Sequence, residues 1–466
     1  MSSYSMTPET TTSTVSRHWW TSRRLMMIVF LIALIVASIA LVGTPEETLL
    51  LALDGNNGHT QWSMPAPMGI GQRGIGIPTA VNGRLYVSVV TPPASNSLLP
   101  NYGWELRALD SASGARVWTF TPDPKQFGKV AAEITASFGA IVTQDTVYVT
   151  LVALDYQVWL VALDVQTGQV KWAHSDLYFN DSGFRGLAGL ILNYAQYSKY
   201  TVVGDKVFAL LRAEDDDDPD APTTTTALTL IALNAQTGET LWSKPITLDN
   251  SKADKVVETM VATETDVYLS IDKTYVYDAA TGDLKQTEDA ALVFITSNTI
   301  YQQHELTLTA TDRATGQQRW QYTPPANTGC MRFTVNEQTL YAFCARGEDD
   351  SVKLDDAAKK LPANWTNFLL ALDVQTGAER WRKPIAENLF TVVGQVPATY
   401  GDRVVVVGGA LGELRVVALT SSGDEAWSYH LERGYDLAVS DGNRVFVTDT
   451  RPRWRGWLAW LNPAWR

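Results

Sequence analysis

The chain has 466 residues, 45% hydrophobic and 10% aromatic, a composition typical of a folded globular protein rather than a disordered one. Its formal net charge is −13 and no basic face can be found in the sequence, so we expect no binding to nucleic acid. This length exceeds one ordinary core, yet no Pro- or Gly-rich linker divides the chain.

The N-terminal region predicts a membrane anchor. Residues 25–43 form an uncharged apolar stretch that would span about 28 Å as a helix, close to the thickness of the hydrocarbon layer. Arginines precede this stretch, whereas Glu46 and Glu47 follow it, so we expect residues 1–24 to be a disordered cytoplasmic segment and the rest to lie outside. The alternative is a cleaved signal peptide, which also exports the rest of the chain.

One short pattern then recurs along the whole chain. Its copies are LALDGNNGHTQW (51–62), RALDSASGARVW (107–118), VALDVQTGQVKW (161–172), IALNAQTGETLW (231–242), YVYDAATGDLKQ (275–286), TATDRATGQQRW (309–320), LALDVQTGAERW (370–381) and VALTSSGDEAW (417–427). Repetition at this scale predicts a repeat architecture, in which each unit buries its apolar face against its neighbours.

Each copy reads as a buried strand followed by a tight turn. The strand is apolar and rich in large or β-branched residues, and the Asp or Asn after it can accept backbone N–H bonds. Four positions later stands a Gly that can take a left-handed conformation. The predicted turn residues are Asp54, Gly58, Asp110, Gly114, Asp164, Gly168, Asn234, Gly238, Asp278, Gly282, Asp312, Gly316, Asp373 and Gly377.

A tryptophan stands four residues after the glycine in nearly every copy. One indole per unit on an outer strand is best used for docking between units, since it buries about 200 Å². The predicted docking residues are Trp62, Trp118, Trp172, Trp242, Trp320, Trp381 and Trp427, and Gln286 is the exception.

A second pattern lies between the copies, as in TAVNGRLYVSV (79–89) and TVVGDKVFALL (201–211), and it has the signature of a hairpin. One hairpin and one turn-bearing strand pair give four antiparallel strands per unit. We therefore predict an all-β, eight-bladed β-propeller over residues 46–450. Residues 48–62 supply the second half of a unit and 436–449 the first half, so these two segments should pair and close the ring.

The insertion SGFRGLAGLILNYAQYSKY (182–200) is apolar. On a loop, its Leu187, Leu190, Ile191 and Leu192 would form an exposed patch for a partner. The alternative is a helix that packs on the ring.

Cys330 and Cys344 are the two cysteines of the chain and lie at equal distances from Glu337, in the middle of a predicted hairpin turn. This spacing places them on facing strands, so they are a candidate disulfide in an oxidising compartment. Two buried free thiols are the alternative, because cross-strand geometry is often strained.

The C-terminal tail, residues 451–466, holds four Trp and four Arg. Its Trp454, Trp457, Trp460 and Trp465 suit a membrane interface. The alternative is a degenerate strand and turn that pack under the ring.

The repeated Ala-x-Asp-x-x-x-Gly-x-x-x-Trp resembles the tryptophan-docking motif of the pyrroloquinoline-quinone (PQQ)-like β-propellers. These include quinoprotein alcohol dehydrogenases and non-enzymatic BamB-like outer-membrane assembly proteins, and the resemblance covers residues 46 to about 450. The dehydrogenases carry adjacent cysteines, calcium ligands and an Asp base, whereas this chain has no Cys-Cys pair. In size and repeat number it is more similar to the BamB-like proteins.

We therefore expect a non-enzymatic binding or scaffold module in the cell envelope of a bacterium, anchored by a single pass with its propeller outside the cytoplasm. Its partner would be an envelope protein or peptide. The alternative is a PQQ-dependent quinoprotein dehydrogenase. We expect no catalytic residue, no PQQ or calcium and no metal site, because His18, His59, His174, His304 and His430 are scattered singly and no recognisable ligand set occurs.

Overall fold

The computed structural model describes residues 46–67, 78–91, 103–127, 140–152, 158–175, 177, 200–212, 227–247, 259–271, 273–346, 366–386, 397–408, 414–432 and 438–452. Its strands belong to one compact unit, Glu46–Arg451. The predicted anchor at 25–43 lies outside the described residues. Within the described ranges, no helix has both the length and the apolar character that a membrane crossing requires.

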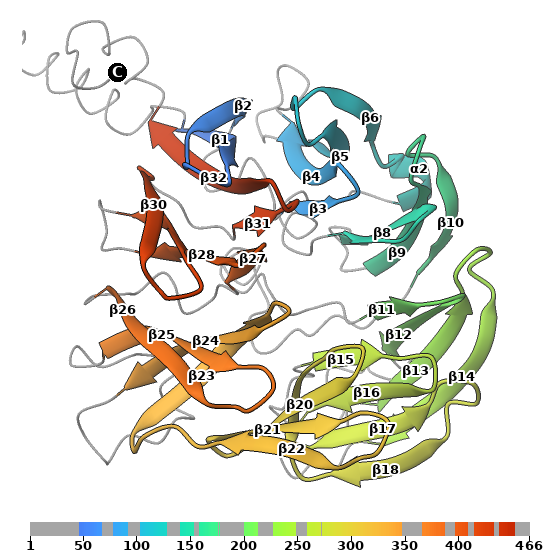
Figure 1. Ribbon diagram of the computed structural model, residues 1–466. Coiled ribbons are helices and arrows are strands. Elements are labelled where there is room, and N and C mark those ends of the chain that lie inside the picture. Colours follow the sequence, from blue (N-terminus) through green and yellow to red (C-terminus); the bar gives the residue numbers. More distant parts are fainter. Residues whose placement is uncertain are drawn as a thin grey trace, which may run out of the picture. The chain divides into compact units, whose positions relative to one another are not determined.

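The described strands form eight four-stranded antiparallel sheets, the blades of a propeller (Figure 1). Blades 1 to 4 comprise β3 (Thr79–Val81), β4 (Arg84–Thr91), β5 (Gly103–Asp110), β6 (Arg116–Phe120); β7 (Ile141–Val142), β8 (Thr146–Val152), β9 (Val158–Asp164), β10 (Val170–His174); β11 (Tyr200–Val203), β12 (Lys206–Arg212), β13 (Ala227–Asn234), β14 (Thr240–Thr247); and β15 (Thr259–Ala262), β16 (Asp266–Ser270), β17 (Thr274–Asp278), β18 (Leu284–Glu288). A short helix, α2 (Pro124–Phe127), follows blade 1.

Blades 5 to 8 repeat this arrangement. They comprise β19 (Ala291–Ile295), β20 (Thr299–His304), β21 (Thr307–Asp312), β22 (Gln318–Tyr322); β23 (Thr328–Val335), β24 (Thr339–Arg346), β25 (Thr366–Asp373), β26 (Glu379–Ala386); β27 (Ala398–Tyr400), β28 (Arg403–Gly408), β29 (Arg415–Leu419), β30 (Glu425–His430); and β31 (Val439–Ser440), β32 (Arg444–Pro452), β1 (Glu46–Asp54), β2 (Thr60–Pro67). First strands of neighbouring blades contact one another, such as β11 with β15, while β6, β10, β14 and β18 lie at the outer edge (Figure 1).

The ring closes through strands from distant parts of the chain, as the sequence predicted. The eighth sheet has the order β2-β1-β32-β31, so the first two described strands pair with the last two. A backbone bond from Gly55 N to Asn443 O (2.9 Å) also joins the two segments. Closure gives the central strands of this sheet a partner on each side and so satisfies their backbone groups.

Both faces of each blade are buried, which explains the continuous apolar runs in the sequence. In β12, Phe208 and Leu210 pack in the apolar cluster shared with blade 4, whereas Val207 and Ala209 pack in the cluster shared with blade 2. Successive side chains of a strand point to opposite faces, so a strand that is covered on both sides needs apolar residues at every position.

The two ends of the strands give the ring two different faces. Val165 N donates to Asp145 O (3.0 Å) and Ala279 N to Thr265 O (3.0 Å), which places the turns between first and second strands beside those between third and fourth strands. We call this the turn face. The other connections leave from the opposite ends of the strands, and we call that side the connection face. Along the sequence, the strand ends on this side are separated by as few as two residues (305–306) and as many as 25 (175–199), and there β1 begins and β32 ends.

Candidate functional site

The turn of most repeats is held by an aspartate. In blade 2 the Asp164 carboxylate accepts N–H bonds from Gln166 (3.0 Å) and Thr167 (2.8 Å), and Gly168 N donates to Asp164 O (2.8 Å). Gly168 has φ 71°, a left-handed conformation that costs other residues about 1–2 kcal/mol. The Thr167 hydroxyl and then the backbone N–H donors stabilise the charged carboxylate and lower the pKa of Asp164. The sequence pattern therefore encodes a charged cap on a tight turn.

The tryptophan of one blade lies on the turn of the next. Trp118 Nε1 donates to Val165 O (3.0 Å), and a Cβ added to Gly168 would lie 2.5 Å from Trp118 Cε3, so the glycine makes room for the indole. Equivalent bonds join Trp62 to Ser111, Trp172 to Ala235, Trp242 to Ala279, Trp320 to Val374, Trp381 to Ser421 and Trp427 to Gly55. Each of these tryptophans and the glycine of the next blade thus form one contact that joins two blades.

The junction between blades 4 and 5 departs from this arrangement. Gln286 occupies the tryptophan position, is exposed, and donates from Nε2 to the neighbouring Glu288 Oε1 (2.6 Å). Gly316 of blade 5 keeps φ 70°, yet no described atom lies within 4 Å of the position that a Cβ would take. The apolar core of this junction consists of the buried Tyr268, Val276 and Leu292, with a few partly buried neighbours.

The residue before the tryptophan makes a second contact that sequence reasoning missed. The register shift between Ala371 and Leu372 leaves Arg380 as the extra, bulged residue of β26. Its Nη2 donates to Asp373 Oδ2 (2.6 Å), and this bond is the main reason that the pKa of Asp373 is lowered to about 2. Arg319 and Gln61 reach the turn aspartates of blades 5 and 8 in the same way. The sequence signal for this contact is the basic or amide residue that directly precedes four of the seven tryptophans, at Gln61, Lys171, Arg319 and Arg380.

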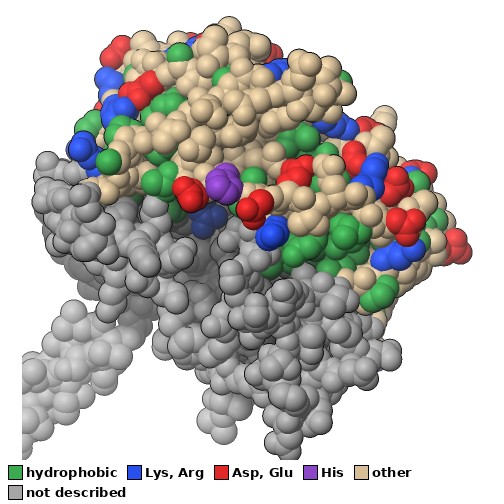
Figure 2. Space-filling view, turned by 90° about the horizontal axis from the view of Figure 1, so that it is seen from below, with side chains coloured by type: hydrophobic (Ala, Val, Ile, Leu, Met, Phe, Trp, Pro, Cys, Tyr) green, Lys and Arg blue, Asp and Glu red, His purple; other side chains and the backbone are tan. Residues whose placement is uncertain are grey.

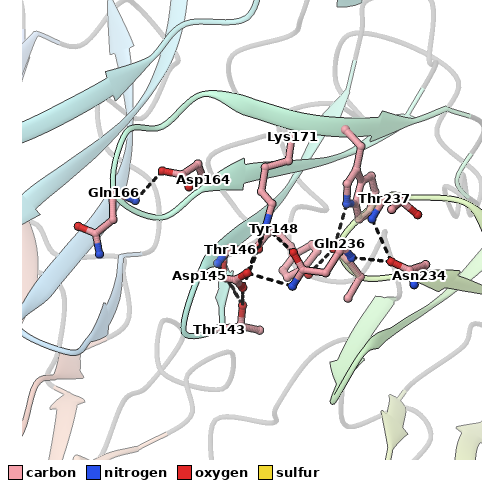
Figure 3. A network of polar contacts seen from close by, with 12 residues as sticks. Thr143, Asp145, Thr146, Tyr148, Asp164, Gln166, Lys171, Asn234, Gln236 and Thr237 are labelled. Atoms are coloured by element: carbon pink, nitrogen blue, oxygen red, sulfur yellow. Dashed lines mark hydrogen bonds and ion pairs between the residues drawn. The ribbon is translucent and has the colours of Figure 1, made fainter.

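In blade 2 the bulged residue, Lys171, forms a polar network with blade 3 (Figure 3). Its Nζ donates to Thr146 Oγ1 (2.8 Å) and Gln236 Oε1 (2.8 Å), and lies 3.3 Å from Asp145 Oδ2. Gln236 Nε2 also donates to Asp145 Oδ2 (2.9 Å). The bond from Gln236, with those from Thr146 and Lys171, lowers the pKa of Asp145 to about 2. The network links two blades on the turn face.

Replacing Asp145 with Asn should destabilise the protein near neutral pH but not in strong acid. The folded pKa of about 2 lies below the ordinary value of 3.8, so the ionised carboxylate contributes stability above about pH 4. That contribution is lost as the pH falls from about 4 to about 2. Denaturant midpoints of wild type and Asp145→Asn should therefore differ near pH 7 and converge near pH 2.

Asp402→Asn, in the exposed turn between β27 and β28, is the matched control, and we expect its midpoint to follow wild type at each pH. A difference between Asp145→Asn and wild type that persists unchanged in acid would contradict a role for the carboxylate charge.

The two cysteines are joined in the structure. Cys330 on β23 pairs in register with Cys344 on β24, and a disulfide connects them across 14 residues of sequence. Cys344 is buried in the core between blades 5 and 6. A bridge that closes a loop of this size typically stabilises a fold by about 3 kcal/mol.

Quinone and calcium are the groups that the dehydrogenases among the PQQ-like propellers bind. Among the described ranges, no group of three His, Cys, Asp or Glu side chains could hold a metal ion. The cysteines are paired across a hairpin and are not adjacent in sequence. The two cysteines therefore do not form the adjacent pair that the dehydrogenases carry.

Two sets of sequence candidates lie outside the described residues. They are the apolar patch Leu187, Leu190, Ile191 and Leu192, and the tail residues Trp454, Trp457, Trp460 and Trp465. On the described surface seen in Figure 2, acidic and basic side chains lie interspersed with apolar ones. This mixed surface is typical of a solvated exterior.

A sequence profile for a family described as outer membrane protein assembly factor BamB matches residues 9–182, 217–367 and 361–451. These ranges include most of the chain and at least two strands of every blade. No curated protein matches the sequence.

Several solved structures are similar to this chain at low sequence identity. BamB from Moraxella catarrhalis is 14% identical over 80% of this chain and 100% of that one, with a TM-score of 0.44. Quinohemoprotein alcohol dehydrogenases from Pseudomonas putida HK5 and Comamonas testosteroni are each 15% identical over 85% of this chain, covering 66% and 67% of theirs, with TM-scores of 0.39 and 0.40. Likenesses with TM-scores under 0.5 carry no argument about the fold or the function of this chain.

Proposed function

Since the chain belongs to the family of the outer membrane protein assembly factor BamB, within the PQQ-like β-propellers, we propose that it is a non-enzymatic binding module of the cell envelope. Its partner is an envelope protein or peptide. The family name supports this class of function but identifies no partner for this chain.

The division of the ring into two faces is the observation that carries the proposal. On the turn face the connections are short, and hydrogen bonds at most of them join neighbouring strands or blades. On the connection face the connections differ in length from blade to blade, and repeat proteins often place their binding surface where such insertions gather. We therefore assign partner binding to the connection face.

Membrane attachment through residues 25–43 belongs to the same proposal. This apolar segment ends three residues before β1 begins at Glu46, and the arginines before it favour a cytoplasmic N-terminus. The full chain should stay in the membrane fraction after alkaline extraction. Release into the soluble fraction would remove the anchor from the proposal.

Photocrosslinking in intact cells tests the binding face. A photoreactive phenylalanine at Gln126 or Glu305 would lie on the connection face, whereas Ala112 and Ala280 supply matched exposed positions on the turn face. We expect adducts with an envelope polypeptide at least about five times more abundant from the first pair. Equal yields from both faces, or adducts only between copies of this chain, would contradict the proposal.

The alternative, a PQQ-dependent dehydrogenase, has a direct test. The purified chain would be mixed with the quinone, calcium and a primary alcohol in the presence of an artificial electron acceptor. Alcohol-dependent reduction of the acceptor would replace the binding proposal with the enzymatic one.

A further inference from the structure

The seven tryptophan junctions define the chemistry of one binding position. At each junction the indole covers the left-handed glycine of the next blade. Its Nε1 donates to a backbone carbonyl two or three residues before that glycine. The fit between Trp172, Gly238 and the carbonyl of Ala235, with Nε1–O 2.9 Å, is representative. The turns of seven blades therefore bind an indole in the same way.

Blade 5 presents the same turn without an indole. Gly316 is exposed and has φ 70°, and nothing in the described ranges lies within 4 Å of its Cβ position. The turn follows the repeat, because Gly316 N donates to Asp312 O (2.8 Å). The carbonyl of Arg313 therefore takes the place that Ala235 has in blade 3. The side chain that should cover this turn, Gln286, is bonded to Glu288 instead.

An aromatic wall is also in place. Tyr268, Val276 and Gln286 stand opposite one another on β16, β17 and β18. The same column in blade 2 holds Tyr148, Ala162 and Trp172, with the two ring centroids 5.8 Å apart. Tyr268 is buried, 5% exposed, and supplies the equivalent ring.

The column differs at its middle residue, where blade 4 has a valine. Val276 packs with Tyr268 and Leu292, so it fills the inner part of the space that an alanine leaves in the other blades. The part above Gly316 stays open. This position therefore lies beside the outer strand β18 and has a larger residue at its base than its seven counterparts.

We propose that this position, which we call the indole slot (Tyr268, Gln286, Arg313 and Gly316), binds a tryptophan side chain of a partner polypeptide. An indole is the group that this chain itself uses on the same turn at every other junction. Tryptophan also buries a large area for one side chain and is frequent among the residues that dominate binding energy. The slot lies apart from the connection face, so its failure would leave the proposed function standing.

Binding of a short peptide tests the slot with the full chain in detergent. The probe is a blocked Gly-Gly-Trp-Gly-Gly peptide that carries 5-fluorotryptophan, observed by fluorine NMR, with the phenylalanine peptide as competitor. We expect saturable binding, with the phenylalanine peptide about five times weaker because it lacks the N–H donor.

The decisive variant places a tryptophan of the chain itself in the slot. Gln286→Trp with Val276→Ala recreates the column of the other blades, and should reduce peptide affinity at least about tenfold while the fold stays as stable as wild type. Val117→Trp, which adds an indole at an exposed position on the outer strand β6 of blade 1, is the matched control, with affinity within about twofold of wild type.

Three results would overturn the proposal. The first is no saturable binding to wild type, and the second is equal binding to the filled variant. The third is self-association of the wild-type chain that the filled variant loses, because the occupant would then be a second copy of this chain and not a different partner.

Discussion

Gly168→Ala is expected to lower the free energy of unfolding by about 3–5 kcal/mol, a large effect for a single methyl group. The left-handed φ of 71° accounts for about 1–2 kcal/mol of this loss. The rest arises because the new Cβ would lie 2.5 Å from Trp118 Cε3, so the indole must move away from the turn. Its bond to Val165 O would lengthen or break.

Gly316→Ala separates these two contributions. Gly316 has nearly the same φ, 70°, but no described atom lies near the added methyl group. We therefore expect a loss of only about 1–2 kcal/mol, from backbone strain alone. Denaturant unfolding of the two variants beside wild type measures the difference, and equal losses would show that the indole is not held against the glycine.

Trp427→Ala should destabilise the protein by about 3–5 kcal/mol, because this tryptophan joins blade 7 to the blade that closes the ring. Trp427 is 7% exposed and donates from Nε1 to Gly55 O (2.8 Å). Tyr400 and Arg403 donate to the same carbonyl. Removing the indole of Trp427 leaves a cavity beside strands β1 and β2.

The equivalent position in blade 4 again supplies the control. Gln286→Ala removes an exposed side chain, and its unfolding free energy should stay within about 0.5 kcal/mol of wild type. Thermal or denaturant unfolding in parallel decides the outcome. A comparable loss in both variants would mean that the docking position stabilises the ring without the indole.

The site could be predicted only in part. The pattern in VALDVQTGQVKW identified the capping aspartate, the left-handed glycine and the docking tryptophan, because turn chemistry depends on residues a few positions apart. It did not identify the partners of Lys171, since Asp145 and Gln236 lie in the turns of two different blades. The sequence showed Gln286 as the exception among the tryptophan positions. It did not predict that Gly316 of the next blade would be left uncovered.

By itself the sequence determined the eight repeats, their strand and turn segments and the pairing of the first and last segments, because alternation, capping and left-handed glycines are local properties. Only the tertiary structure decided which neighbour each indole contacts. Trp118 and Val165 are 47 residues apart, and Trp427 and Gly55 are 372 apart, yet both pairs meet in the same geometry. The physical reason is that docking acts across blade faces, whose contacts depend on the closed ring and not on distance along the chain.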